Sequence, residues 1–164
     1  MNLNGQQWTC EFDFGKTGLE RGLQNSKGFS TPINVPFCPE STLSGIGYTD
    51  FIEAMFYHRT LEIPASWAGK LILLHFGAVD YECELFLDGK SVGTHLGGSV
   101  SFNFDITDYV NPGKTHDLVL YVKDDRRSGW QPSGKQSAPW KSSGCSYTRT
   151  TGIWQTVWME PVSK

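Results

Sequence analysis

Residues 70–106 read KLILLHFGAVDYECELFLDGKSVGTHLGGSVSFNFDI, and they carry most of the information about the architecture. The apolar run 70–76 predicts a central strand. In residues 81–87 apolar and polar side chains alternate with the period of two that is typical of a strand. Asp88-Gly89 is a two-residue hairpin signal, so residues 81–87 are expected to pair with residues 90–96. The stretch therefore predicts consecutive antiparallel strands.

The same alternation recurs along most of the chain, and helical periodicity is almost absent. About eight or nine short strands separated by turn residues are typical of a two-sheet sandwich. We therefore expect an all-β fold, a two-sheet β-sandwich of the jelly-roll type. The further strands are expected near residues 8–14, 33–35, 55–63, 100–106, 118–123 and 153–160.

Length and composition limit the possible classes of protein. The 164 residues predict one domain over residues 1–164, too few for a (β/α)₈ barrel of about 250 residues. A net charge of −3 argues against a nucleic-acid partner, and no apolar run approaches the ~20 residues of a membrane span. No secretory signal opens the chain, which favours a cytoplasmic location; a periplasmic or secreted location stays open if a leader was removed.

No metal or cofactor is expected from the sequence. The four histidines are scattered, and the wide spacing of the four cysteines matches no zinc pattern. Free, buried thiols are favoured over a disulfide framework for Cys10 and Cys83, which lie among alternating apolar residues. No G-x-G-x-x-G follows a strand and opens a helix, so a dinucleotide site is not indicated.

Glu82 and Glu84 project from one face of a predicted strand, about 7 Å apart. Two carboxylates at such a separation can serve glycoside hydrolysis, which would make the chain a small jelly-roll glycosidase. The next residue on that face is Phe86, and an ordinary solvated strand face explains the pair better.

The longest aperiodic segments are residues 15–53 and 123–151, and loops of this length are usually functional or held against another body. The second is rich in polar and aromatic side chains. Such side chains suit a sugar, because rings stack on a pyranose while carboxylate, amide and guanidinium groups bind its hydroxyls. The alternative, that the tryptophans pack the loop onto its own sandwich or a neighbouring domain, is equally open. The candidates for sugar contact are Asp124, Asp125, Trp130, Gln131, Lys135, Gln136, Trp140, Tyr147 and Arg149.

Four motifs resemble the N-terminal sugar-binding sandwich of glycoside hydrolase family 2, the family of β-galactosidases, β-glucuronidases and β-mannosidases. NLNGQQWTCEFD (2–13) is similar to its opening strand, and INVPFCPESTLSGIG (33–47) to its proline-rich approach loop. Residues 56–110 resemble its central strands, and SYTRTTGIWQTVWMEPV (146–162) its exit strand. The resemblance covers nearly the whole chain.

The resemblance implies a non-catalytic domain whose partners are a β-glycoside substrate and the immunoglobulin-like and barrel domains of a larger enzyme. The barrel, absent from this chain, would carry the two catalytic glutamates of a retaining glycosidase, so no catalytic residue is assigned here. In β-galactosidases of the family an Asp shortly before G-I-[FW] touches the sugar. Residues 145–154 hold no Asp, which puts galactose specificity in doubt.

Arg149 matches the basic residue that precedes G-I-[FW] in the family. A structural role, with bidentate bonds to Asp124 or Asp125, is slightly favoured over sugar contact. The middle of the loop, Gln131, Lys135 and Gln136, is a better candidate for the rim of the substrate pocket, and residues 37–40 are weaker ones. A stand-alone carbohydrate-binding module remains the main alternative function.

Overall fold

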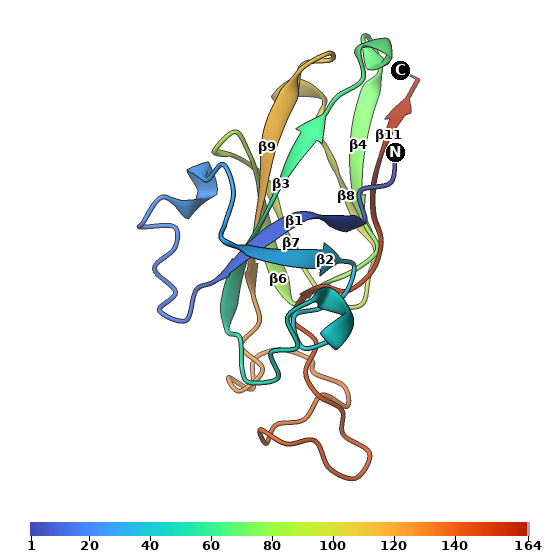
Figure 1. Ribbon diagram of the computed structural model, residues 1–164. Coiled ribbons are helices and arrows are strands. Elements are labelled where there is room, and N and C mark those ends of the chain that lie inside the picture. Colours follow the sequence, from blue (N-terminus) through green and yellow to red (C-terminus); the bar gives the residue numbers. More distant parts are fainter. Residues whose placement is uncertain (164) are drawn as a thin grey trace.

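The computed structural model describes residues 1–163 and shows an antiparallel β-sandwich (Figure 1). The larger sheet has six strands in the order β2-β1-β3-β9-β6-β7. Its strands are β1 (Gly5–Phe12), β2 (Thr31–Val35), β3 (Ala54–Glu62), β6 (Glu82–Leu87), β7 (Lys90–Leu96) and β9 (Thr115–Lys123).

The smaller sheet has three strands in the order β11-β4-β8, so the run predicted as a central strand does lie in the middle of a sheet. These are β4 (Leu71–Phe76), β8 (Phe102–Asp105) and β11 (Val157–Val162), and a two-stranded ladder joins β5 (Val79–Asp80) to β10 (Gly152–Ile153). The expected all-β sandwich is confirmed. The helical segments of residues 1–163 are short 3₁₀ turns, none long and apolar enough to cross a membrane: η1 (Leu23–Asn25), η2 (Thr42–Ser44), η3 (Ala65–Trp67) and η4 (Thr107–Tyr109).

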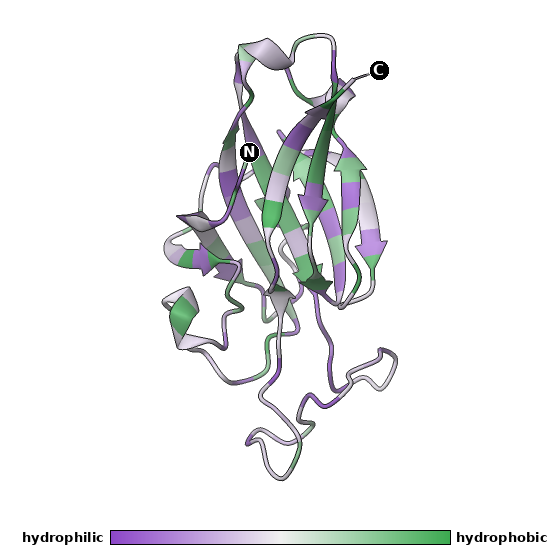
Figure 2. Ribbon diagram, turned by 90° about the vertical axis from the view of Figure 1, so that its right-hand side faces the viewer, coloured by the Kyte–Doolittle hydropathy of each residue, from purple (hydrophilic) through white to green (hydrophobic). Residues whose placement is uncertain are grey.

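The main core lies between the two sheets and follows from the period of two. In β4 the residues alternate strictly between half-buried and buried, so Ile72, Leu74 and Phe76 face inward. Trp8 is fully buried opposite them, packs edge-on against Tyr57, and donates from Nε1 to the carbonyl of Leu3 at 2.7 Å. Figure 2 shows the resulting alternation of apolar and polar residues along the strands.

A second apolar cluster covers the outer face of the larger sheet. Phe56, Phe86 and Tyr121 are buried there beneath Leu23 and Phe29, which belong to the aperiodic segment after β1. This cover explains why β3 is buried on both faces, although its sequence alternates. The first half of the segment 15–53 is therefore part of the packing.

The Asp88-Gly89 turn joins β6 to β7 as predicted, with Leu87 opposite Lys90. Both turn residues have positive φ, 48° and 79°, which is the requirement of a type I′ hairpin turn. The Asp88 carboxylate also accepts hydrogen bonds from the His116 ring at 2.6 Å and the Asp117 N–H at 2.9 Å. These bonds tie the hairpin to β9.

The segment between β9 and β10 projects from one end of the sandwich as a loop without regular structure (Figures 1 and 2). The two chain termini lie beside β4 and β11, away from this loop (Figure 1). We call residues 124–151 the long loop. The four cysteines are free thiols: Cys10 and Cys83 are buried, as their place among alternating apolar residues predicted, whereas Cys38 is half-buried and Cys145 is exposed.

Candidate functional site

All nine predicted sugar-contact residues lie in the long loop, and its aromatic rings are exposed. Trp130 is 93% exposed, Trp140 56% and Tyr147 64%. The two limbs of the loop are held together where the N–H of Ser137 donates to the carbonyl of Tyr147 at 2.7 Å. The Tyr147 N–H in turn donates to the carbonyl of Lys135 at 2.8 Å. The backbone of the loop that carries the rings is therefore held by hydrogen bonds.

Arg149 is the anchor of the loop. It is buried, and its guanidinium donates to the carbonyls of Pro139 at 2.8 Å and Trp140 at 3.0 Å, and to those of Ser137 and Thr49. Its planar group also stacks over the ring of Phe51 at 4.3 Å. The structural role favoured from the sequence fits this position, but the predicted partners, Asp124 or Asp125, are wrong. The loop turns its own carbonyls toward the guanidinium, so backbone oxygens replace the carboxylate.

Asp124 and Asp125 are neighbours with different surroundings. Asp124 is buried and accepts from the Gln131 amide at 2.6 Å and the Thr151 hydroxyl at 3.0 Å, so it ties both ends of the long loop together. Asp125 is partly exposed and lies 3.4 Å from Lys16, whose ammonium also pairs with Glu53 at 2.8 Å. Of the two, Asp125 is the carboxylate within reach of a ligand.

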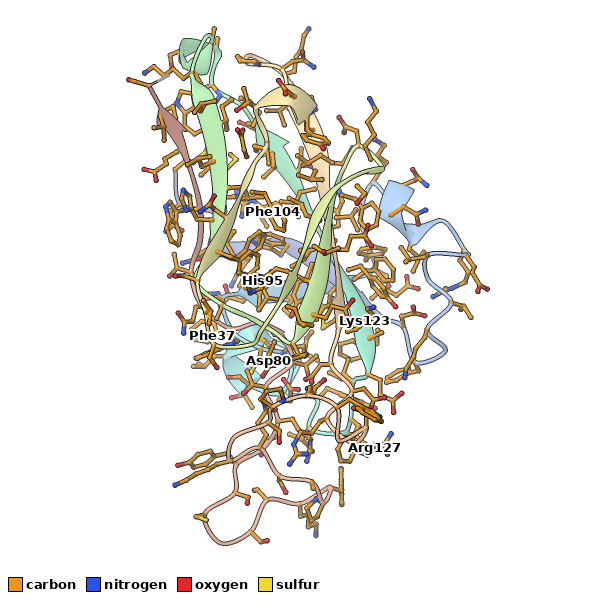
Figure 3. The ribbon with its side chains drawn as sticks, turned by 180° about the vertical axis from the view of Figure 1, so that it is seen from behind. Phe37, Asp80, His95, Phe104, Lys123 and Arg127 are labelled. Carbon is orange, nitrogen blue, oxygen red and sulfur yellow. The ribbon has the colours of Figure 1, made fainter. Side chains whose placement is uncertain are left out.

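Asp80 and Glu40 join Asp124 as buried acids at the base of the loop. Asp80 accepts from the Gln136 amide at 2.7 Å, and Glu40 accepts from the Thr151 N–H at 3.2 Å. One oxygen of Asp80 and one of Glu40 have no hydrogen-bond partner within residues 1–163. Asp80 lies at the end of the sandwich that faces the loop (Figure 3).

Burial changes the acidity of these three groups. Desolvation, together with the charges of Asp124 and Glu40, raises the pKa of Asp80 to about 7, against the lowering effect of the hydrogen bond from Gln136. Desolvation also raises the pKa of Glu40 to about 7, against the lowering effect of hydrogen bonds from Thr151. The pKa of Asp124 is raised as well, chiefly by burial. At neutral pH the base of the loop therefore carries a partial negative charge.

Sequence reasoning ranked Glu40 low and did not single out Asp80. Asp80 interrupts the apolar run GAVDY, and an acid inside such a run is the signal that could have identified it. The proline-rich approach loop brings Glu40 to the site, and no local sequence pattern predicts its contact with Thr151.

Two hollows flank the long loop, and Tyr81 lines both. The first, which we call the Gly98 pocket, has a volume of about 540 Å³, and the second, the Trp130 pocket, about 300 Å³. The Gly98 pocket is lined by Asp80, Tyr81, Gly97–Val100, Pro132–Gly134, Gln136, Thr150 and Trp154. The Trp130 pocket is lined by Lys16, Glu53, Tyr81, Glu82, Leu96, Lys123, Asp125, Ser128, Trp130 and Gln131.

The predicted candidates are thus divided by the structure. Asp125, Trp130 and Gln131 line the Trp130 pocket, and Gln136 lines the Gly98 pocket. Asp124 and Arg149 are buried supports. The remaining three, Lys135, Trp140 and Tyr147, line neither of these hollows.

Glu82 and Glu84 do not form a catalytic pair of free carboxylates. Glu82 pairs with Lys123 at 2.6 Å, and Glu84 accepts from the Ser91 hydroxyl at 2.6 Å. Their partners are neighbours on the same sheet, as expected of a solvated strand face. Within residues 1–163 no cluster of His, Cys, Asp and Glu has a geometry that could hold a metal ion.

Residues 6–158 match the sequence model of a family described as glycosyl hydrolases family 2, sugar binding domain. The chain belongs to this family. The resemblance inferred from the four motifs is confirmed.

Relatives in the family are much longer proteins. A beta-galactosidase of Thermoanaerobacter pseudethanolicus is 26% identical over 111 residues, which is 68% of this chain and 14% of that protein. A beta-glucuronidase of Paenibacillus borealis is 27% identical over 118 residues, 71% of this chain and 20% of that protein. The chain therefore corresponds to a small part of each relative, its sugar-binding domain.

Solved structures agree on the architecture. The beta-glucuronidase of Ruminococcus gnavus superposes with a TM-score of 0.77 over 99% of this chain and 28% of that one, at 19% identity. At this level of identity the likeness establishes the fold alone. The β-sandwich is thus the fold of the corresponding part of that enzyme.

Proposed function

We propose that this chain acts as a non-catalytic domain of a family 2 β-glycosidase, where it serves as a scaffold and holds the long loop at the rim of the substrate pocket. The carrying observation is the contrast within the loop: Arg149 and three buried acids fix its base, while its aromatic rings remain exposed. A loop that only capped its own sandwich would bury those rings.

The hydrolysis itself belongs to a separate catalytic domain in this proposal. That domain would cleave β-linked O-glycosides with an acid/base and a nucleophile, two carboxyl groups about 5–5.5 Å apart. The carboxylates of Glu82 and Glu84 have polar partners on the sheet, which supports a non-catalytic role for this chain. The names of the relatives, beta-galactosidase and beta-glucuronidase, support a β-glycoside as the substrate class.

The direct test is an activity assay of the purified chain. Incubated with nitrophenyl β-galactoside and nitrophenyl β-glucuronide, the chain is expected to release no nitrophenol above the level of the E82Q/E84Q double variant. Robust hydrolysis by the chain would overturn the proposal in favour of an independent glycosidase, and its loss in the double variant would assign the activity to Glu82 and Glu84.

A stand-alone carbohydrate-binding module is the second candidate, and the three exposed rings favour it. Trp130, Trp140 and Tyr147 could stack on consecutive sugars of a polymer. Calorimetry with a panel of soluble polysaccharides distinguishes the two functions. A module predicts strong binding that W130A and W140A abolish, whereas a rim domain predicts only weak binding of small glycosides.

A further inference from the structure

Two glycines and a tryptophan lie together in the lining of the Gly98 pocket, and we call Gly97, Gly98 and Trp154 its floor. Gly97 and Gly98 present backbone without side chains, and the Trp154 ring, 36% exposed, lies beside them. The Trp154 Nε1 donates to the carbonyl of Gly98 at 2.7 Å, which fixes the orientation of the indole. Aromatic faces and bare backbone together offer the apolar contact that a pyranose ring needs.

Hydrogen-bonding groups border this floor. The Gln136 amide is held in place from both ends, because it donates to Asp80 at 2.7 Å and accepts from the Thr150 N–H at 2.9 Å. Ser99 and Ser133 also line the pocket. Orientation of a neutral ligand by a few fixed polar groups is typical of small-molecule sites.

In the described part of the chain, the ionisable side chains that line the Gly98 pocket are acidic only. Among residues 1–163, the pocket lining includes no Lys, Arg or His. Its one carboxylate in that range belongs to Asp80, of which only 6% is exposed. One oxygen of Asp80 has no hydrogen-bond partner there. A β-carbon added at Gly98 would lie 2.3 Å from that oxygen, so the Gly98 backbone packs directly against the Asp80 carboxylate and leaves no room for a side chain. Asp80 therefore acts on a ligand through its charge and through Gln136.

The lining groups and their charges identify a ligand class. We propose that the Gly98 pocket binds one uncharged sugar ring, stacked on Trp154 and hydrogen-bonded to Gln136, and that it disfavours uronates. An anionic sugar would lie beside a buried carboxylate with no cation in the pocket lining, because the Arg126 guanidinium, which donates to the Gln136 carbonyl at 2.7 Å, is not among the lining residues. This inference rests on the proposed sugar-rim function and adds to it the site and the charge of the sugar.

The test uses the purified chain at pH 8 and low salt, with the indole N–H of Trp154 followed in ¹H–¹⁵N spectra. Methyl β-D-galactopyranoside and methyl β-D-glucopyranoside are the neutral probes, and methyl β-D-glucuronide is the anionic one. We expect a saturable shift of Trp154 with a neutral probe, and affinity for the glucuronide at least about fivefold weaker.

Two variants, each of which fills one of the two pockets with a tryptophan ring, show where the sugar binds. Val100 and Leu96 are both exposed aliphatic residues, one in each pocket. V100W is expected to abolish the neutral-sugar shift, whereas L96W, which fills the Trp130 pocket, leaves it unchanged. A third variant, S99K, places a cation in the Gly98 pocket and is expected to raise affinity for the glucuronide.

Three outcomes would overturn the inference: equal affinity for the neutral and anionic probes, binding lost in L96W but kept in V100W, or no shift with any probe. Each would leave the non-catalytic role intact, because that role fails only if the chain alone hydrolyses glycosides.

Discussion

The sandwich and the long loop are ordered by different forces. In the sandwich, side chains such as Trp8, Leu74 and Phe76 are fully buried between two sheets. In the long loop the large apolar side chains are exposed, and the buried residues are polar: Asp124, Ser137, Arg149 and Thr151. Burial of apolar area is worth about 25 cal/mol per Å², whereas a typical hydrogen bond contributes only about 1 kcal/mol net.

The comparison shows how a rigid fold can hold an irregular surface. Hydrogen bonds are directional, so a loop fixed by them can keep a specific shape without covering its rings. The same bonds are easily lost if one partner is removed, because a buried polar group is then left unsatisfied. The sandwich should therefore tolerate changes in the loop, and the loop should not tolerate the loss of its anchors.

The largest expected effect is in the core. W8A removes a fully buried indole and its hydrogen bond to Leu3, and we expect the free energy of unfolding to fall by about 3–5 kcal/mol. W130A is the matched control, since that ring is 93% exposed, and it should change stability by less than about 0.5 kcal/mol. Urea denaturation followed by circular dichroism measures both. Equal losses in the two variants would mean that the loop is part of the core.

Removal of the loop anchor should have a smaller and local effect. R149A leaves the carbonyls of Pro139 and Trp140 without their donor, and a loss of about 2–3 kcal/mol is expected. R149K should not rescue it, because an ammonium cannot match the planar fork of a guanidinium. Hydrogen exchange should become faster in residues 137–151 and stay unchanged in β3 and β9. R127A, at an exposed ion pair with Glu53, is the control with a loss below about 1 kcal/mol.

The acids at the base of the loop predict a pH dependence. Asp80 and Glu40 have folded pKa values of about 7, above their unfolded values, so the folded state binds more protons than the unfolded state between about pH 4 and pH 7. Stability therefore falls as pH rises through this window, by at most ~1.4 kcal/mol per pH unit for each of the two groups. Denaturation midpoints at pH 5 and pH 8 measure the slope. D80N removes one titrating group and should flatten the slope; an unchanged slope would exclude Asp80 as a source.

These two regions also differ in how far the sequence predicts them. The strands, the Asp88-Gly89 hairpin and the central position of β4 follow from a period of two and from turn chemistry, which are local signals. The cover of Leu23 and Phe29 on the outer face of β3 was not predicted, because nothing in an aperiodic segment shows which surface it will meet.

The site is predicted in part, for a related reason. Composition singled out the long loop, but it did not separate the buried Asp124 from the exposed Asp125, since their difference arises from Gln131 and Thr151 folding back. The buried position of Arg149 fits the structural role that the sequence favours, while the carboxylate partners predicted for it are wrong, because backbone carbonyls have no sequence signature. Asp80 and Glu40 come to the site only through tertiary contacts with the long loop, so no local sequence pattern predicts them there.

The smallest expected effect concerns Glu82 and Glu84, on the outer face of the larger sheet. Both are partly exposed, and their bonds to Lys123 and Ser91 are of the kind that contributes about 0–1 kcal/mol. E82Q/E84Q should therefore unfold within about 1 kcal/mol of the parent chain and leave the Trp154 shift unchanged. The Lys123 ammonium would lose its carboxylate partner, so any small loss should shrink as salt is added. A large, salt-independent loss would mean that this outer face stabilises the fold as the core does. The outer face would then be a third region, distinct from both the core and the long loop in how it is stabilised.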